Sequence, residues 1–240
     1  MHEFHYEKTP EDLFDPILPY VSIDLETLGL NPDAPIIQAA AVVEYSQKVA
    51  VEDLPSFEYN MALWGKLDNC EAYAIHMNKN VISDIVENGG VRAKELLVAL
   101  RAAFDFASRK TGELRDRLSI DAESEDLDES SKRSAFYMLS EMPRKSKVML
   151  AGKNIQKSDL IWLKRFFYRE GFGNEWDELA EKYVWHRVLD PGPMFFPKIG
   201  IIPSLNGCKS LLGISGEVKH EALEDARDVI RVVRALSKNT

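Results

Sequence analysis

The sequence predicts an α/β domain in which helices cover a mixed β-sheet, and the order of its apolar segments is the main reason. Three strand-like runs come first, at residues 21–26, 36–43 and 57–61, and they indicate an opening antiparallel meander. Helical and strand-like segments then alternate. The chain has 240 residues, 45% hydrophobic and 29% charged, which suits one soluble globular domain spanning residues 1–240.

The spacing of apolar residues assigns the later elements. Apolar residues recur at helical spacing in residues 92–107, which predicts the first long helix. A buried strand is predicted at residues 148–151 and a short strand at 188–190. The remaining predictions are helices at residues 158–170 and 175–183, a short helix capped by Ser204 and closed by Gly213, and a long amphipathic helix at 221–236.

Residues 109–147 differ in composition from the rest of the chain, because they are charged and rich in serine. Within them, residues 121–129 hold a run of acidic side chains. We interpret residues 109–147 as an exposed, partly mobile insertion in which residues 135–139 form a short packed piece. A solvated loop is favoured over a cation site for the acidic run.

Charge and cysteine content restrict the partners and the compartment. A net charge of −9 argues against a protein that grips long duplexes, although bound divalent cations reverse the sign of an acidic site locally. No apolar run approaches the roughly 20 residues that span a bilayer, and residues 1–8 are too polar for a signal peptide. The absence of such a run predicts no membrane partner. Cys70 and Cys208 lack metal-site spacing, which predicts reduced thiols and a cytoplasmic location.

The first strand places two carboxylates on one face. Alternation along Val21-Ser22-Ile23-Asp24-Leu25-Glu26 directs Asp24 and Glu26 to the same side, about 7 Å apart. Like charges on a rigid strand repel each other, so a cation between them would stabilise the pair. An exposed polar face is the alternative interpretation of the strand alone.

Two predicted helices also carry an aspartate on the apolar face. Asp159 lies among apolar residues in the helix at 158–170, and Asp225 projects between apolar residues of the helix at 221–236. A carboxylate in such a position needs a compensating partner. For Asp159, a first-turn acid that complements the helix dipole is the alternative. The other acids of the last helix, Glu221, Glu224 and Asp228, are expected to be solvated.

His220 precedes the last helix, where a loop-borne imidazole can lean over a site, although a histidine at a helix start is often structural or exposed. Four carboxylates on three separate elements, with one histidine, are suited to phosphodiester hydrolysis. Carboxylate oxygens suit Mg²⁺ or Mn²⁺, and two such ions stabilise the attacking and the departing oxygen. A histidine can accept a proton from the attacking water.

These residues lie in three motifs through which the chain resembles the DEDDh 3′→5′ exonucleases. The motifs are Asp24-Leu25-Glu26-Thr27-Leu28-Gly29-Leu30, then Gly152-Lys153-Asn154-Ile155-Gln156-Lys157-Ser158-Asp159, and His220-Glu221-Ala222-Leu223-Glu224-Asp225-Ala226 with the pattern His-x-Ala-x-x-Asp. They occur in the family's order, and the resemblance covers roughly residues 20–236. It implies a ribonuclease-H-like fold. Arg187-Val188-Leu189-Asp190 is similar to a segment of oligoribonucleases and of exonucleases carried by bacteriophages.

The resemblance implies a role for each motif residue. Asp24, Glu26 and Asp225 would hold one metal ion, Asp24 would be shared with a second ion, and Asp159 would complete the site partly through water. His220 would be the general base. Four residues would contact the substrate: Thr27 through its backbone at the terminal nucleotide, Leu30 as a wedge against the terminal bases, and His76 and Asn154 near the substrate end. Leu30 as an ordinary turn hydrophobe remains open.

The expected function is therefore metal-dependent 3′→5′ hydrolysis of single-stranded DNA or RNA, short oligoribonucleotides included, to 5′-mononucleotides with two Mg²⁺ or Mn²⁺ ions. Because oligoribonucleases act as dimers, a homodimer is left open. Three alternatives remain: a catalytically inactive module on the same fold that binds nucleic acid or protein, a metal phosphohydrolase acting on nucleotides, and an interaction protein working through residues 109–147.

Overall fold

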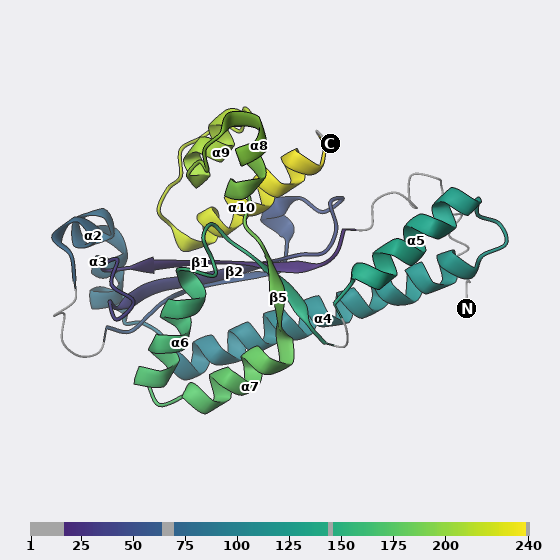
Figure 1. The fold of residues 1–240 in the computed structure, drawn as a ribbon. Helices are drawn as coiled ribbons and strands as arrows, with labels where there is room; N and C mark the ends of the chain where they lie inside the picture. Colours follow the sequence, from purple (N-terminus) through teal and green to yellow (C-terminus); the bar gives the residue numbers. More distant parts are fainter. Residues whose placement is uncertain (1–16, 64–69, 144–145, 239–240) are drawn as a thin grey trace.

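A five-stranded mixed sheet forms the centre of the computed structural model, which describes residues 17–63, 70–143 and 146–238 (Figure 1). The strand order is β3-β2-β1-β4-β5. Strands β1 to β3 pair antiparallel, whereas β4 joins β1 and β5 joins β4 in parallel. The strands are β1 (Tyr20–Thr27), β2 (Ile36–Glu44), β3 (Ser56–Asn60), β4 (Val148–Ala151) and β5 (Val184–Leu189). The predicted meander and the predicted mixed sheet are both confirmed.

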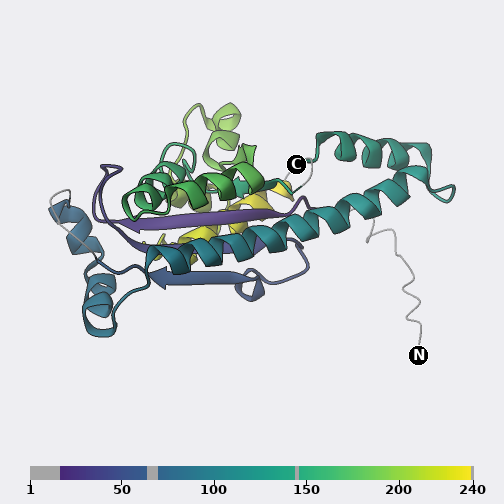
Figure 2. The same ribbon diagram turned by 90° about the horizontal axis from the view of Figure 1, so that it is seen from below.

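Helices cover both faces of this sheet (Figures 1 and 2). One face packs on α4, α6 and α7, and the other packs on α9 and α10. The helices are α2 (Ala72–Met77), α3 (Lys79–Asn88), α4 (Ala93–Glu123), α5 (Glu129–Glu141), α6 (Asp159–Arg169), α7 (Gly173–Tyr183), α8 (Phe196–Ile199), α9 (Leu205–Leu211) and α10 (Ala222–Ser237), with 3-10 turns η1 (Val51–Asp53) and η2 (Gly192–Phe195).

The alternation along β1 decides which side chains enter which layer. Val21 and Ile23 are buried in the cluster built with α4. Ser22 points to the other face, where its hydroxyl donates a hydrogen bond of 2.8 Å to the carbonyl of Ala226 on α10. Because side chains two residues apart share a face, Asp24 and Glu26 are also directed toward α10.

The described part of the insertion at residues 109–147 is packed over much more than the short piece at 135–139 that we expected. Helix α4 continues to Glu123, and α5 returns beside it to form a helical arm that extends away from the sheet (Figure 2). Leu114, Leu118, Ala135 and Met142 are buried between the two helices. Each helix buries one apolar stripe and exposes its charged residues, so a high charge content is compatible with two packed helices.

The last helix corrects a second expectation, because Asp228 is buried rather than solvated. Its carboxylate contacts the ammonium of Lys209 on α9, and both side chains are about 95% buried, with 5% and 4% of their surface exposed. Arg231 lies 2.6 Å from the other carboxylate oxygen. The acidic run also contains a buried member, Asp121 on α4. Glu221 is exposed as expected, and Glu224 is half-buried in ion pairs with Arg227 and Arg231.

Lys209→Met should lower the free energy of unfolding by about 3 kcal/mol, because Asp228 would keep a buried charge with only Arg231 as partner. Arg165→Gln is the matched surface control. It removes an ion pair with Asp33 whose side chains are half exposed, which contributes about 0–1 kcal/mol. Urea denaturation of both variants measures the difference. Equal losses would show that the buried pair adds nothing beyond an ordinary surface contact.

Several smaller expectations are confirmed. Ser204 caps α9 through a hydrogen bond from the amide of Gly207, and Cys70 and Cys208 are not disulfide-bonded. Strand β5 begins at Val184, four residues before the predicted start, and α2 and α3 were not predicted. The polar segment 1–8 lies outside the described residues. In the part of the chain that the structure describes, no helix is both long and apolar enough to cross a membrane.

Candidate metal centre

The C-terminal half of β1 forms the floor of the candidate site. Only residues 20–22 of β1 pair with β4, so beyond Ser22 this strand has a hydrogen-bonded neighbour on the β2 side only. Asp24 and Glu26 lie in this segment. The N-terminal turn of α6 contacts β1 here, through a hydrogen bond between the backbone of Leu25 and Asp159. Pairing with β4 therefore ends where the carboxylates begin, which leaves backbone groups on that side of β1 able to hold residues of the site.

Helix α6 brings Asp159 to β1. The Asp159 carboxylate accepts hydrogen bonds from the Ser158 hydroxyl at 2.6 Å and from the backbone of Leu25. The turn before α6 depends on Asn154, which has a positive φ of 60° and donates its amide to Asp190 at 3.0 Å. Asparagine tolerates this left-handed conformation better than most residues. The second motif thus forms a tight turn that directs Asp159 at the strand.

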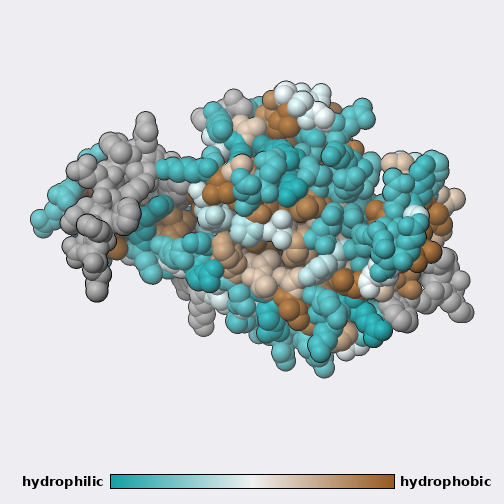
Figure 3. All heavy atoms as spheres, turned by 180° about the vertical axis from the view of Figure 1, so that it is seen from behind, coloured by the Kyte–Doolittle hydropathy of each residue, from teal (hydrophilic) through white to brown (hydrophobic). Residues whose placement is uncertain are grey.

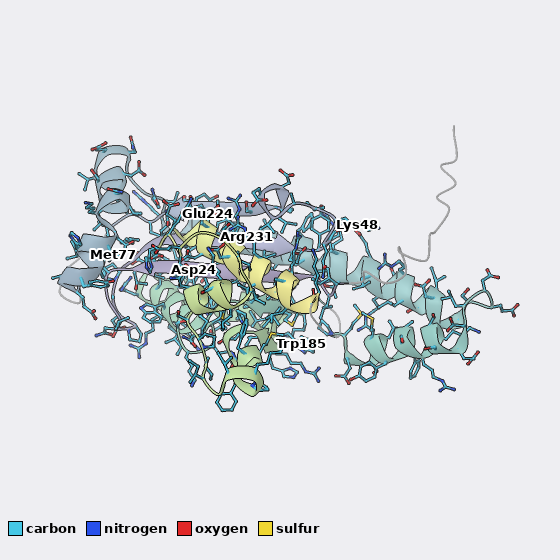
Figure 4. The ribbon with its side chains drawn as sticks, turned by 90° about the horizontal axis from the view of Figure 1, so that it is seen from above. Asp24, Lys48, Met77, Trp185, Glu224 and Arg231 are labelled. Atoms are coloured by element: carbon cyan, nitrogen blue, oxygen red, sulfur yellow. The ribbon has the colours of Figure 1, made fainter. Side chains whose placement is uncertain are left out.

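Helix α10 brings Asp225 to the same place, with His220 just before it. In Figure 4, viewed from the α10 side, Asp24 lies beside the first turns of this helix. Ligand atoms of Glu26, His220 and Asp225 all lie within 4.8 Å of one another. His220 is exposed and has a positive φ of 56°, an uncommon conformation for a residue other than glycine. The backbone is therefore bent where the imidazole meets the carboxylates.

Burial raises the pKa values of all four carboxyls, and repulsion from neighbouring carboxyls adds to the rise at Asp24, Glu26 and Asp225. The pKa of Asp24 is raised well above its usual value, first by burial and then by Asp159, Asp225 and Glu26. Burial, with Asp225 and Asp159, raises the pKa of Glu26 to about 7. Burial and the nearby Asp228 raise the pKa of Asp225 to about 7. Burial raises the pKa of Asp159 to about 6 against the hydrogen bond from Ser158.

Four carboxyls that repel one another require either protons or cations. Asp225 favours cations over protons, because its Oδ1 is buried and has no hydrogen-bond partner among the described residues. Carboxylate oxygens with space for water are the ligands that Mg²⁺ and Mn²⁺ prefer. The side chains present therefore fit a divalent centre, and Asp24, Glu26, Asp159 and Asp225 are the residues that would hold the ions.

The predicted substrate-contact residues lie around this centre without joining it. Thr27 ends β1 and donates its hydroxyl to the carbonyl of Gly29 at 2.8 Å. Leu30 is 80% exposed, and its amide donates to Glu71 just before α2. His76 is exposed on α2. Asn154 is exposed, and its side-chain oxygen accepts a hydrogen bond from Lys153.

Two polar residues that sequence reasoning missed support the site. Asn78 is buried, and its side chain makes a hydrogen bond with Glu26 that opposes the rise of that carboxyl's pKa. Gln38 is buried in β2 and accepts a 2.8 Å hydrogen bond from the amide of Ala222, which fixes the first turn of α10. A glutamine within the apolar run 36–43 was a signal that the sequence offered. The role of Asn78 depends on a contact between distant segments and had no such signal.

The raised pKa values predict that the metal-free protein loses stability as the pH rises from about 4 to about 7. Each carboxyl keeps its proton to a higher pH in the folded chain than in the unfolded chain, where the pKa is about 4. The folded state therefore binds more protons in this interval, and the free energy of unfolding falls as they dissociate. Thermal melting in chelator across this range measures the effect. A melting temperature that rises from pH 5 to pH 7 would contradict the burial of these carboxyls.

No protein-family model matches this sequence, and no curated protein matches it either. Its fold is similar to that of a solved structure of exonuclease I, a protein whose structure is described as suggesting how processivity is achieved. The two structures align with a TM-score of 0.58 and 12% sequence identity over 92% of this chain, which spans 41% of the length of that chain. The mixed sheet, its flanking helices and this likeness confirm the predicted α/β, ribonuclease-H-like fold.

Proposed function

We propose that this protein is a metal-dependent 3′→5′ exonuclease that hydrolyses single-stranded DNA or RNA to 5′-mononucleotides. The convergence of Asp24, Glu26, Asp159 and Asp225 beside His220 is the observation that carries the proposal. Carboxyls with raised pKa values in one place are typical of functional sites. The fold that the chain shares with exonuclease I adds support, although a shared fold does not fix an activity.

In the proposed mechanism, Asp24, Glu26, Asp159 and Asp225 would hold two Mg²⁺ or Mn²⁺ ions. The bound ions would supply positive charge that stabilises the attacking and the departing oxygen. A ring nitrogen of His220 accepts a proton from water as the water oxygen attacks the phosphorus of the last phosphodiester. The bond between that phosphorus and the 3′ oxygen of the preceding nucleotide breaks, and this oxygen takes up a proton. A 5′-mononucleotide leaves, and the shortened strand has a new 3′ hydroxyl.

The residues at the end of β1, beside the candidate metal centre, suit a terminal nucleotide rather than a duplex. Leu30 presents an exposed apolar side chain beside the end of β1, where it can pack against a base. Thr27 lies at the irregular end of the β1–β2 ladder, and its backbone would contact a sugar hydroxyl of the terminal nucleotide. The net charge of −9 is consistent with a small contact area on the nucleic acid.

Cleavage of end-labelled oligonucleotides tests the direction and the class of reaction. We expect a 20-mer with a 5′ label to give a ladder that shortens with time in Mg²⁺ or Mn²⁺ and stays intact in chelator. A 3′-terminal phosphate, which removes the free 3′ hydroxyl, is the matched substrate control and should slow the reaction. Binding without cleavage in either metal would favour the inactive binding module. Hydrolysis of nucleoside triphosphates alone would favour a nucleotide phosphohydrolase.

A further inference from the structure

The outer edge of the sheet carries a cavity that the catalytic proposal does not use. β5 is an edge strand, and beside it lies a cavity of about 750 Å³ formed with the end of α5 and with α7. Its lining combines an aromatic ring with cationic side chains: Trp185, His186, Arg187, Lys147 and Lys182. Figure 4 shows Trp185 on the side of the molecule where the arm leaves the sheet, well separated from Asp24.

Two neighbouring side chains of β5 contact the ring of Trp185. Trp185 and Arg187 are two residues apart on the strand, and the guanidinium lies 5.0 Å from the centre of the indole ring. His186 contacts the same ring edge-on at 5.4 Å. Arg187 is also 2.8 Å from Glu141, but both side chains are about half exposed, so this ion pair contributes little. The guanidinium is therefore free to exchange Glu141 for a phosphate at small cost.

The cavity is connected to the candidate metal centre through the second motif. The side-chain amide of Gln156, in the turn before Asp159, donates to the carbonyl of His186. Further along the strand, Leu189 pairs with Ala151, and Gly152 donates its amide to Leu189. Trp185 precedes Leu189 by four residues, roughly 13 Å of extended strand. A single strand that follows β5 from the second motif to the indole therefore spans several nucleotides.

Helix α5 extends the same surface onto the arm. Ser140 lines the cavity, and one turn earlier on the same side of the helix lies Phe136, which is 70% exposed. Tyr137 beside it is 68% exposed, and Lys132 and Arg133 precede the two rings by four residues. Aromatic side chains next to cations are the chemistry that holds unpaired bases and their backbone.

We propose that the β5 cavity binds unpaired bases of the single-stranded substrate upstream of the cleaved bond. This inference rests on the proposed exonuclease function and adds a second contact that only longer strands reach. The cations Lys147, Lys182 and Arg187 are balanced by three glutamates in the lining. Binding is therefore driven by stacking, and the logarithm of the association constant should fall with the logarithm of salt by a slope of only about −1.

Anisotropy of a labelled oligothymidylate 20-mer measures this contact separately from turnover. The measurement uses the Asp24→Asn background in Mg²⁺, in which the proposed catalysis is blocked. Adding Trp185→Ala should weaken binding about tenfold, because it removes one base-stacking ring. Trp185→Phe keeps a ring and should stay within about threefold. Arg187→Gln provides a second test if the alanine variant melts at a lower temperature.

A matched control lies at the opposite edge of the sheet. There, β3 and α4 form an apolar groove of about 410 Å³ on the back of the molecule, and Val98 in this groove is 60% exposed (Figure 3). Val98→Ala removes exposed apolar surface but no aromatic ring and no cation, and it should leave 20-mer binding unchanged. Cleavage of a dinucleotide by Trp185→Ala in the otherwise native chain should also be unchanged, because the dinucleotide cannot reach β5.

The possible results separate this inference from the catalytic proposal. The proposed base binding at the β5 cavity fails if Trp185→Ala leaves the affinity for the 20-mer unchanged. It also fails if the 20-mer does not bind at all. Neither result would affect the interpretation of any observed cleavage. If the native chain cleaves nothing but Trp185→Ala still weakens the 20-mer, the cavity stands and the exonuclease proposal fails. A similar loss for Val98→Ala would show that the effect is not specific to β5.

Discussion

Asp24→Asn is expected to lower the rate of nucleotide release by about 10³-fold or more. Asp24 interacts with Asp159, Asp225 and Glu26, so its carboxylate lies at the centre of the group that would hold the ions. Loss of cation charge at the reacting oxygens costs several kcal/mol in the transition state. Each 1.36 kcal/mol corresponds to a tenfold change in rate.

The same substitution should make the metal-free protein more stable, because it removes one of four mutually repelling carboxylates. Mg²⁺ should raise the melting temperature of the native chain, through preferential binding to the folded state, and should do so far less in the variant. Asp177→Asn, a substitution on the exposed surface of α7, is the control and should change neither quantity. If Asp24→Asn retained most of the activity, the four carboxylates could not have the catalytic role proposed for them.

His220→Ala is expected to lower the rate by about 10²- to 10⁴-fold, the range for loss of a positioned general base. Its effect on metal affinity decides the role of the side chain. A ligand atom of His220 lies within 4.8 Å of those of Glu26 and Asp225, which is compatible both with proton transfer and with coordination. A general base should leave the affinity for Mn²⁺ within a few-fold of the native value.

Calorimetric titration of Mn²⁺, together with single-turnover rates, separates the two roles. Equal losses in affinity and rate would identify His220 as a ligand or as a structural residue. The positive φ of 56° at this position adds a control, because His220→Asn retains a residue that tolerates the left-handed conformation. His220→Asn should fold like the native chain and yet be as slow as the alanine variant.

The parts of the fold that the sequence predicted are those in which local pattern and final environment agree. β1 and β2 alternate or run apolar because both faces of the sheet are covered, and α10 shows one clear apolar stripe. The arm was misinterpreted because its helices bury only a narrow stripe, and the charges on the remaining surface resemble those of a solvated loop. The amino-acid composition of such helices reflects their exposed surface more than the few residues that pack between them.

The residues of the site also fall into two groups: those that a local sequence pattern indicated, and those that depend on contacts between distant segments. Asp159 and Asp225 were recognisable because each interrupts an apolar helix face, and the structure brings both to Asp24 and Glu26. The burial of Asp228 was not recognisable, because it depends on Lys209 from another helix. Asn78 likewise reaches Glu26 only because α3, which it precedes, packs against β2 and β3. Partners between distant segments leave no periodic trace in a single sequence.

The proposed hydrolysis to 5′-mononucleotides can be tested by quantifying the products of an unlabelled single-stranded oligonucleotide in Mn²⁺. Native protein and Asp24→Asn would be incubated with matched DNA and RNA strands, and the released nucleotides would be identified by mass. We expect the native protein to release 5′-mononucleotides from DNA or RNA from the earliest time point. We expect none in chelator and almost none from Asp24→Asn. Oligonucleotide fragments, 3′-phosphorylated products or equal release by the variant would contradict the proposed hydrolysis.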